Sequence, residues 1–398
     1  MGLTQHENAV ANIQEIVNLL LLRGSIGKPG AGVCPVRGHS NVQGDRTVGI
    51  HERPSPEFLD RLGAKFGFSP PRKPGFDVVD SIRAMRDGRA KVFFAMGGNF
   101  LSAAPDTETT AAALRTTRLT VHVSTQLNRS HLIAGRQAII LPCLGRTEED
   151  RQASGLQFVS VENSMGVVHQ SRGRARPASD HLLSEPAIVA RLAKAVLGER
   201  SRVDWDRIVE DYDHVRSAIE QVVPGFEDYN ARVRKPGGFY LPNGPREGTF
   251  TTPTGKAHFT VHPLPRHDLA RGQFLMMTVR SHDQFNTTIH GLRDRYRGIS
   301  NERRVVLLNR ADLDELGIAD GAVVDLTSDF RGERRVARSF VATAYDIPRR
   351  CAATYFPEAN VLVPLDSVAD ESNTPASKSV VISITQTAST TPFADGPR

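Results

Sequence analysis

The densest group of side chains that could bind a ligand lies in residues 27–44, which read GKPGAGVCPVRGHSNVQG. Glycines and prolines here break the leucine-rich helical pattern before the segment, and glycine lets a backbone come close to a ligand. Few apolar residues separate its side chains with hydrogen-bonding capacity, which are Cys34, Arg37, His39, Asn41 and Gln43. Arginine, asparagine and glutamine recognise anionic and amide-like groups. The segment is therefore either a ligand-binding loop or an ordinary loop that ends a helix.

Polar turns follow three apolar runs that read as buried strands, at residues 91–96, 119–123 and 138–141. The turns carry, in chain order, Gly97-Gly98-Asn99, Ser124-Thr125-Gln126 and the acidic group Glu148-Glu149-Asp150. Strands that alternate with helical patterns predict a parallel sheet, in which ligands bind at the carboxyl ends of the strands. Taken alone, a Gly-Gly-Asn turn is a weak signal and is more typical of a tight strand-to-helix connection than of a nucleotide contact. The acidic group would most simply form a solvated turn, and one of its carboxylates could instead accept hydrogen bonds from a ligand.

A second polar segment, SHDQFNTTIHG at residues 281–291, follows an apolar run at 274–280 that reads as a strand. It is too polar to form a core, and it follows the strand too closely to be a mere linker. His282 and His290 are candidate metal ligands, but no third ligand with suitable spacing accompanies them. The sequence therefore predicts a ligand-binding loop here and no metal site.

The elements that position these residues change in type along the chain. Helical patterns occur at residues 7–23, 77–86, 107–115, 184–197 and 204–222. Residues 54–75 are rich in proline and glycine and read as a connector, and a similar cluster at 232–245 ends the part with alternating helices and strands. From Phe250 onward the pattern is one of short strands separated by turns. The order predicts an α/β part followed by a mostly β part.

Composition sets broader limits on the class of protein. The 398 residues suffice for two or three domains, and the contents of 39% hydrophobic and 24% charged residues are typical of soluble globular proteins. The net charge is +6, but the arginines are scattered and only 6% of residues are aromatic, which favours an anionic cofactor or a solvated surface over nucleic acid. The three cysteines lie far apart in the sequence and suggest no disulfide framework, which favours a protein of the reducing cytoplasm. No apolar run is long enough to span a membrane, and no signal peptide is recognisable.

Residues 1–44 resemble an internal segment of the large subunit of molybdopterin-dependent oxidoreductases, in which a G-x-TQ turn, a helix and a P-x-RG-x-x-N-x-QG loop follow in that order. The resemblance is greatest to the formate-dehydrogenase-like branch. It continues through TPTGKA at 252–257, LNRADLDELGIADGAVVDLTS at 308–328 and SNTPASKSVVISI at 372–384. It implies that the chain is a C-terminal portion, so that the iron–sulfur region and the segment with the metal-ligating side chain are expected upstream of Met1.

The resemblance implies a particular fold. We expect an α/β Rossmann-like domain with a parallel sheet, followed by a mostly β domain that resembles a six-stranded double-psi barrel. Residues 1–50 would be the end of an incomplete α/β domain together with the cofactor loop. Residues 51–245 would form the Rossmann-like cofactor-binding domain, and residues 246–398 the barrel that binds a molybdopterin dinucleotide.

The resemblance also implies a cofactor, molybdenum or tungsten held by two molybdopterin guanine dinucleotides (bis-MGD), with a 4Fe-4S cluster only in the missing upstream part. The Gly98 turn would contact the guanosine diphosphate arm of one pterin. An exposed charge before the last strand explains Lys378 almost as well as a ligand contact does. The residues that the family pattern places at the cofactor are Gln5, Asn41, Gln43, Gly44, Gly98, Asn99, Ser124, Gln126, Arg280, Ser281, His282, Asn286, Thr287, Asn360, Asn373 and Lys378.

Two residues are candidates for catalysis by the same resemblance. Arg37 would lie beside the metal and orient a small anionic substrate such as formate, since a guanidinium offers a planar fork to a carboxylate. The branch often carries glutamine at position 39, so His39 would either relay a proton or hydrogen-bond the pterin.

The predicted function is a two-electron oxidation or reduction of a small substrate by a molybdopterin-dependent, formate-dehydrogenase-like enzyme. The expected partners are an upstream N-terminal fragment or an electron-transfer subunit, and the expected location is the cytoplasm. The alternative is a catalytically silent scaffold or electron-transfer subunit that retains the fold.

Overall fold

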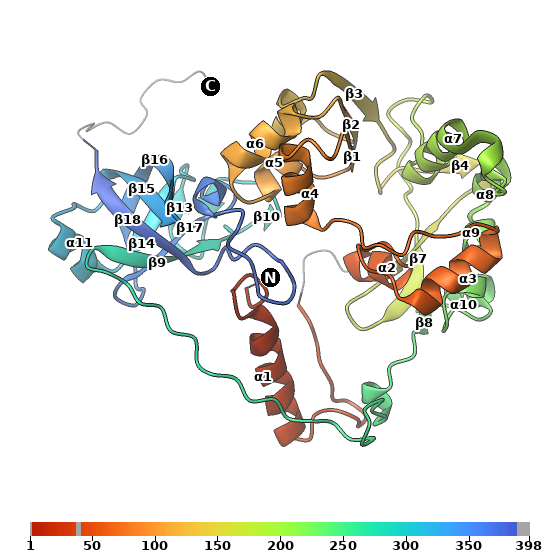
Figure 1. Ribbon diagram of the computed structural model, residues 1–398, viewed down its shortest axis with the longest axis horizontal. Coiled ribbons are helices and arrows are strands. Elements are labelled where there is room, and N and C mark those ends of the chain that lie inside the picture. Colours follow the sequence, from red (N-terminus) through yellow and green to blue (C-terminus); the bar gives the residue numbers. More distant parts are fainter. Residues whose placement is uncertain (1, 37–40, 388–398) are drawn as a thin grey trace.

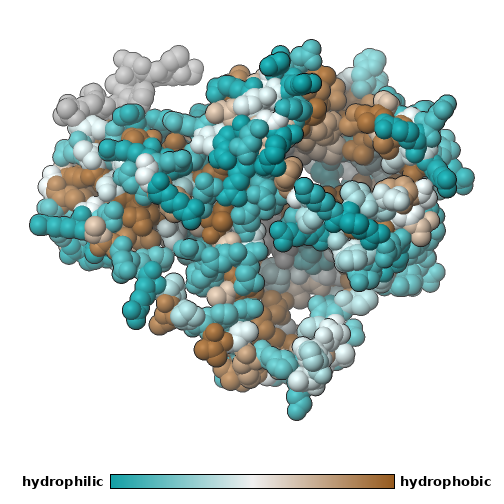
Figure 2. Space-filling view, viewed as in Figure 1, coloured by the Kyte–Doolittle hydropathy of each residue, from teal (hydrophilic) through white to brown (hydrophobic). Residues whose placement is uncertain are grey.

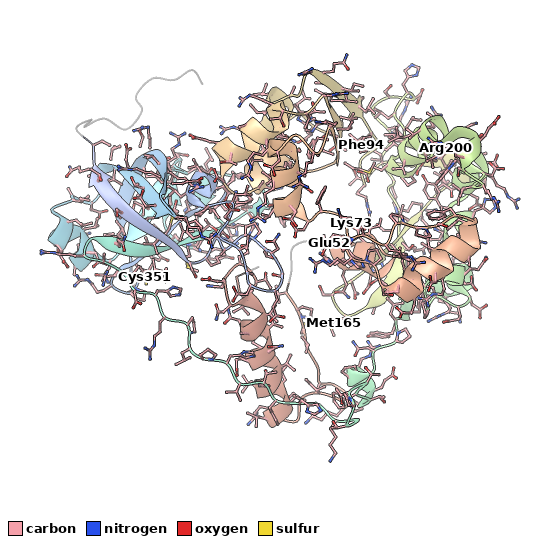
Figure 3. All side chains as sticks on the ribbon, viewed as in Figure 1. Glu52, Lys73, Phe94, Met165, Arg200 and Cys351 are labelled. Atoms are coloured by element: carbon pink, nitrogen blue, oxygen red, sulfur yellow. The ribbon has the colours of Figure 1, made fainter. Side chains whose placement is uncertain are left out.

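The computed structural model describes residues 2–36 and 41–387 (Figure 1). It consists of a β-barrel, a small parallel sheet with its helices, and a third group of helices and hairpins, with α1 (Ala9–Leu22) below them in the view of Figure 1. Single side chains mark these parts in Figure 3, with Cys351 in the barrel, Phe94 in the parallel sheet and Arg200 in the third group. Among the described residues, no helix has the length and apolar character needed to cross a membrane.

The barrel is closed and has six strands in the order β14-β16-β15-β18-β9-β17, because β14 also pairs with β17. Large apolar side chains such as Met276, Leu326 and Phe340 fill its centre and are almost fully buried. The predicted mostly β part is therefore confirmed. The strands are β9 (Gln273–Val279), β14 (Val305–Leu308), β15 (Val323–Phe330), β16 (Glu333–Ala344), β17 (Cys351–Tyr355) and β18 (Val380–Gln386).

Short elements surround the barrel. Asn309 caps α11 (Arg310–Leu316) by accepting a hydrogen bond from the Ala311 amide at 2.9 Å, and Gly317 ends the helix in the left-handed conformation. The polar segment after β9 folds into two small hairpins rather than an extended loop. These consist of β10 (Gln284–Phe285) with β11 (Thr288–Ile289), and β12 (Arg293–Asp294) with β13 (Ile299–Ser300).

The parallel sheet has three strands in the order β1-β2-β3, as the alternation of strands and helices predicts. Its strands are β1 (Val92–Met96), β2 (Leu119–Ser124) and β3 (Gln137–Pro142). Helices α4 (Val78–Arg86), α5 (Phe100–Ala103) and α6 (Thr107–Arg115) enclose a core with it in which Ile82 and Leu114 are fully buried. Leu365, which lies between β17 and β18, joins the same core. This group therefore packs directly against the barrel part of the chain.

The third group contains the remaining long helices and several hairpins. Its helices are α2 (Asn41–Thr47), α3 (Pro56–Phe66), α7 (Glu185–Leu197), α8 (Trp205–Glu210), α9 (Tyr212–Val222) and α10 (Tyr229–Val233). Its strands are β4 (Arg151–Gln152), β5 (Gly155–Leu156), β6 (Val159–Glu162), β7 (Val167–Ser171) and β8 (Phe239–Tyr240). The expected helix at 184–197 forms, capped by Ser184. The expected connector at 54–75 is wrong in part, because α3 forms within it with Ser55 as its cap and Pro56 in its first turn.

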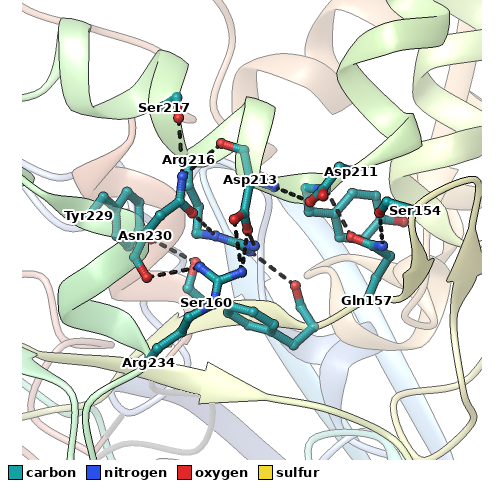
Figure 4. Close-up of polar contacts among 12 residues, drawn as sticks. Ser154, Gln157, Ser160, Asp211, Asp213, Arg216, Ser217, Tyr229, Asn230 and Arg234 are labelled. Carbon is teal, nitrogen blue, oxygen red and sulfur yellow. Dashed lines mark hydrogen bonds and ion pairs between the residues drawn. The ribbon is translucent and has the colours of Figure 1, made fainter.

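A buried arginine organises the third group (Figure 4). The Arg216 guanidinium is stacked over the Phe158 ring with 3.9 Å to the ring centroid, and it pairs with Asp213. Asp213 also pairs with Arg234 at 2.7 Å, and Arg216 donates to the side-chain oxygen of Asn230 at 2.7 Å. These contacts tie α9 and α10 to the hairpin of β6 and β7, so we assign these polar groups to stabilising the fold.

An extended segment at residues 249–272 connects the third group to the barrel and passes along α1 (Figure 1). Asn18 on α1 holds it in place by donating to the Thr260 carbonyl at 2.8 Å and accepting from the Thr260 amide at 3.2 Å. Apolar side chains gather on the surface of α1 (Figure 2), among them Leu19 and Leu22. The remaining short helices are η1 (Arg129–Leu132), η2 (Gly198–Arg200), η3 (Pro245–Glu247) and η4 (Asn360–Leu362).

Candidate functional site

Two basic side chains meet at one end of the barrel. Arg280 directly follows β9, and Lys378 lies two residues before β18, the strand that pairs with β9. The Lys378 ammonium is buried and donates to the carbonyl of Thr278 and, at 3.2 Å, to its hydroxyl. The Arg280 guanidinium is half-buried and lies over the Phe356 ring at 4.6 Å from its centroid. The barrel thus holds both cations in fixed positions.

The charges of these two side chains are not balanced within the described residues. Burial lowers the pKa of Lys378 to about 8, and repulsion from Arg280 contributes to the shift. Burial likewise lowers the pKa of Arg280. Among the residues the structure describes, no carboxylate forms an ion pair with either cation. Two partly desolvated positive charges are costly to keep side by side, and an anion that binds both would offset that cost.

The hydrogen bonds of Ser281 fix the loop that carries Arg280. The Ser281 amide and hydroxyl both donate to the side-chain oxygen of Gln284, at 2.9 and 3.1 Å. Arg303 donates to the Ser281 hydroxyl at 2.6 Å and pairs with Glu358 at 2.9 Å. The sequence analysis missed Gln284, Arg303 and Glu358. Gln284 lies within the loop itself, whereas Arg303 and Glu358 support it from later in the chain, where no local spacing reveals them.

The other predicted residues of this loop have fewer contacts. The Nδ1 of His282 lies 2.9 Å from the Asp283 carboxylate, and its ring lies edge-on to Tyr296. Asn286 adopts a positive φ of 50° in the turn between β10 and β11, and Thr287 beside it is half-buried. The loop that follows Arg280 therefore carries an imidazole, an amide and a hydroxyl.

The N-terminal segment also reaches this end of the barrel. The carbonyl of Gln5 accepts a hydrogen bond from the Lys378 amide at 3.0 Å, and His6 contacts the Ser379 hydroxyl at 3.0 Å. Burial lowers the pKa of His6, and the nearby charges of Lys378 and His267 lower it further. The structure thus brings Gln5, Arg280 and Lys378 together, although 275 residues or more separate Gln5 from the other two.

A second group of predicted residues lies at the carboxyl edge of the parallel sheet. Gly97 and Gly98 follow β1 with φ of 69° and 73°, and no described atom lies within 4 Å of where their Cβ atoms would be. Asn99 accepts a hydrogen bond from the Ser130 hydroxyl at 2.7 Å, while Ser124 ends β2 next to this turn and is buried. Gln126 is exposed just beyond it. The glycines leave one side of the turn open to a ligand.

The acidic group after β3 is engaged within the protein. Glu148 accepts hydrogen bonds from the amides of Gly145 and Ala178, at 2.6 and 3.0 Å. Asp150 accepts from Gln152 at 2.6 Å and from Tyr212 at 2.5 Å. Glu149 pairs with Arg151 at 2.9 Å.

The loop at residues 27–44 leads to a cavity of about 800 Å³ between α1, the loop and the β6–β7 hairpin. Gln43 lines this cavity and donates to Glu162 at 2.5 Å, and Thr47 donates to the other carboxylate oxygen of Glu162 at 2.6 Å. The Gly44 carbonyl accepts a hydrogen bond within this helical turn. Arg37, His39 and the side chain of Asn41 lie outside the described residues.

The two predicted asparagines of the barrel part contact other parts of the protein. Asn360 is buried, and its amide donates to the carbonyls of Ser102 and Ala104 at 2.7 and 3.1 Å. Asn373 donates to Asp77, the cap of α4, at 2.8 Å. The hydrogen bonds that the two asparagine side chains donate therefore connect the barrel part to the helices beside the parallel sheet.

Comparison with known proteins identifies the family of the chain. Residues 274–381 match a family model described as the Molydopterin dinucleotide binding domain, a range that includes both Arg280 and Lys378. The oxidoreductase Rv2900c of Mycobacterium tuberculosis is 54% identical over 394 residues, which are 98% of this chain and 51% of that protein. The chain belongs to the molybdopterin oxidoreductase family. It spans about half the length of the curated relatives it matches.

Further similar proteins extend the comparison. Protein YdeP of Escherichia coli (strain K12) is 47% identical over 390 residues, which cover 96% of this chain and 51% of that protein. YrhE of Bacillus subtilis, provisionally named a formate dehydrogenase, is 35% identical over 105 residues, 24% of this chain. Among solved structures, acetylene hydratase from Pelobacter acetylenicus covers 83% of this chain and is itself covered to 50%, with a TM-score of 0.51 and 13% identity. That last likeness shows a shared fold.

The described residues contain no cluster of side chains that could bind a metal ion without a cofactor. No three of their histidine, cysteine, aspartate and glutamate side chains are grouped for metal binding. The barrel end and the sheet edge, with their cations, glycine turn and amides, are suited instead to the organic and phosphate parts of a ligand.

Proposed function

We propose that the barrel end formed by Arg280, Lys378 and the Ser281 loop binds the phosphate groups of a molybdopterin guanine dinucleotide. The observation that carries this proposal is the buried Lys378 beside the half-buried Arg280, neither with a carboxylate partner among the described residues. A guanidinium offers a planar fork to phosphate oxygens, and an ammonium offers a compact charge. The match of residues 274–381 to the dinucleotide-binding model supports the same assignment.

The parallel sheet would hold the second dinucleotide of a bis-MGD cofactor. The open turn at Gly98 and the polar groups of Asn99 and Ser124 lie where ligands bind in open α/β sheets, at the carboxyl ends of the strands. This assignment treats the sheet as Rossmann-like and the barrel as double-psi. Such a cofactor, once bound, supplies a molybdenum or tungsten centre for two-electron redox chemistry. The residues of this chain would orient its arms.

The reaction we propose is the oxidation or reduction of a small anion such as formate. Arg37 would orient the substrate, and His39 would carry a proton or bond the pterin. The chain spans about half the length of its curated relatives, and we propose that activity also requires their second half, which it does not match and which would carry the 4Fe-4S cluster. The weak likeness to YrhE favours formate as the first substrate to assay.

A calorimetric titration of the purified chain with guanosine diphosphate tests the binding proposal. The free energy lost with each charged hydrogen bond is about 1.5–3 kcal/mol, so Arg280→Ala or Lys378→Met should weaken binding at least tenfold. Arg310→Ala is the matched control, since this exposed arginine pairs with Asp320 and is not among the residues assigned to the ligand. Absence of binding, or equal affinity in all four proteins, would falsify the proposal.

A second assay separates an enzyme from a silent scaffold. In a preparation loaded with cofactor and joined to the second half, Arg37→Ala should abolish turnover with formate while the bound pterin remains. A scaffold would show no turnover in the wild type.

A further inference from the structure

The small hairpin of β12 and β13 contains a carboxylate that is almost completely buried. Asp294 of β12 is 2% exposed and accepts hydrogen bonds from the Tyr355 hydroxyl and from Arg297, each at 2.7 Å. Its other oxygen accepts from the Tyr296 amide at 3.1 Å. Burial alone would raise the pKa of this carboxyl, but the hydrogen bonds from Tyr355 and Arg297 hold it below its usual value. Asp294 is therefore a buried anion that Arg297 balances.

The nitrogen of Arg297 that bonds Asp294 makes a second contact. This Nη1 also donates to the backbone carbonyl of Arg280, at 3.1 Å. A terminal guanidinium nitrogen carries two hydrogens, so it can serve both acceptors at once. Because Asp294 fixes this nitrogen, the hairpin also fixes the carbonyl of Arg280, which lies 17 residues earlier in the chain.

The hairpin supports the same loop at another point. The Tyr296 ring lies against the His282 ring, with 4.8 Å between the two centroids. His282 and Arg280 flank Ser281, whose hydroxyl Arg303 holds separately at 2.6 Å. The hairpin therefore contacts the loop on both sides of Ser281.

The backbone position of Arg280 matters because its side chain has little other anchorage. The guanidinium lies over the Phe356 ring, and none of the described residues accepts a hydrogen bond from it. Its direction therefore depends on where the chain leaves β9. A ligand-binding side chain works best when the residues behind it hold it in one geometry.

We propose that Arg297, held by Asp294 and Tyr355, is a positioning residue that sets the geometry in which Arg280 meets an anion. The inference rests on the proposed function, which identifies the anion as a phosphate group of the dinucleotide. It differs from a purely structural role of the ion pair, because its effect on the ligand must pass through Arg280.

The test is a calorimetric titration with guanosine diphosphate of Arg297→Met in two backgrounds. We expect binding to weaken by about tenfold when the substitution is made in the wild type, and no further loss when it is made in Arg280→Ala. Such non-additivity identifies side chains that act as one unit. Arg349→Met is the matched control, since Arg349 pairs with another buried aspartate of the barrel part, Asp312, at 2.5 Å, and it should bind like the wild type.

Loss of Arg297 leaves the buried charge of Asp294 without its partner, which could prevent folding. The double variant Asp294→Asn, Arg297→Met removes both charges and takes the place of the single variant if urea unfolding shows that the latter is not folded. The same results are expected of it.

A second measurement needs no nucleotide. Phenylglyoxal modifies arginine side chains, and mass spectrometry of peptides gives its rate at Arg280 in the ligand-free chain. We expect this rate to rise several-fold in Arg297→Met and to stay unchanged in Arg349→Met. An equal loss of affinity in both backgrounds, or an unchanged rate at Arg280, would overturn the inference. If the wild type bound no guanosine diphosphate, the proposed function would fail, and the phenylglyoxal rates would still decide whether Arg297 positions Arg280.

Discussion

At the scale of single residues, the chemistry of the barrel end depends on how burial changes two ordinary basic groups. The sequence analysis assigned Arg280 and Lys378 to a ligand from a family pattern, with an exposed charge as the competing explanation for Lys378. The structure buries Lys378 against Thr278 and excludes that explanation. Burial of a charge near a like charge follows from the pairing of β9 with β18 and the loops around it, which no local pattern reveals.

Binding of an anion at this end should depend on pH through Lys378. Since its pKa in the free protein is about 8, the ammonium is almost fully charged at pH 7 and loses its charge as the pH rises through 8. The affinity for guanosine diphosphate should therefore be constant up to about pH 7 and fall by up to tenfold per pH unit above 8. Calorimetric titrations between pH 6.5 and 9.5 measure this change.

Two variants serve as controls for this dependence. Lys378→Arg keeps a permanent charge and should flatten the profile, while Lys378→Gln should bind weakly at every pH. A profile that falls equally in the wild type and in Lys378→Gln would assign the dependence to another group.

At the scale of elements, sequence patterns predicted what each segment forms better than what it contacts. The strands at 91–96, 119–123 and 138–141 and the helix at 184–197 formed, because apolar periodicity and capping residues act locally. Helix α3 was missed although Ser55, Pro56 and Gly67 are the start and stop signals of a helix. The prolines and glycines around it were read as a connector, when some of them mark the ends of that helix.

The turn after β1 gives a prediction at this scale. Gly98 has a φ of 73°, which costs an L residue about 1–2 kcal/mol, so Gly98→Ala should lower the free energy of unfolding by that amount. Gly291→Ala is the control, because Gly291 has open space around its Cβ position and no positive φ. Urea unfolding of both variants measures the difference. Equal stability of the two would contradict the strain assigned to this turn.

At the scale of the whole molecule, contacts between distant segments join the barrel to the parallel sheet. Asn360 donates to two carbonyls near α5, and Arg335 of β16 pairs with Asp106 at 2.7 Å. The family pattern assigned the Asn360 amide to the cofactor, but in the structure its two hydrogens are used within the protein. A spacing rule cannot predict such contacts, because the partners are more than 200 residues apart.

Substitution of Asn360 should therefore loosen the whole molecule. Asn360→Ala leaves two buried carbonyls without a donor, and the free energy of unfolding should fall by about 2–4 kcal/mol. Asn373→Ala, whose partner Asp77 is half-buried, should lower it by a smaller amount. Urea unfolding compares the two. If Asn360→Ala left stability unchanged and reduced only nucleotide binding, Asn360 would belong to the ligand site.

The central claim is that the barrel of this chain holds a molybdopterin dinucleotide through Arg280 and Lys378. Its most direct test is to co-express the chain with the unmatched half of its Mycobacterium tuberculosis relative, purify the complex, and measure extracted pterin by fluorescence and molybdenum and tungsten by mass spectrometry. We predict pterin, guanine nucleotide and one of the two metals in the wild type, and at least a tenfold loss of all three in the Arg280→Ala, Lys378→Met double variant. A wild-type complex without pterin and metal, or a double variant with its full content, would contradict the claim.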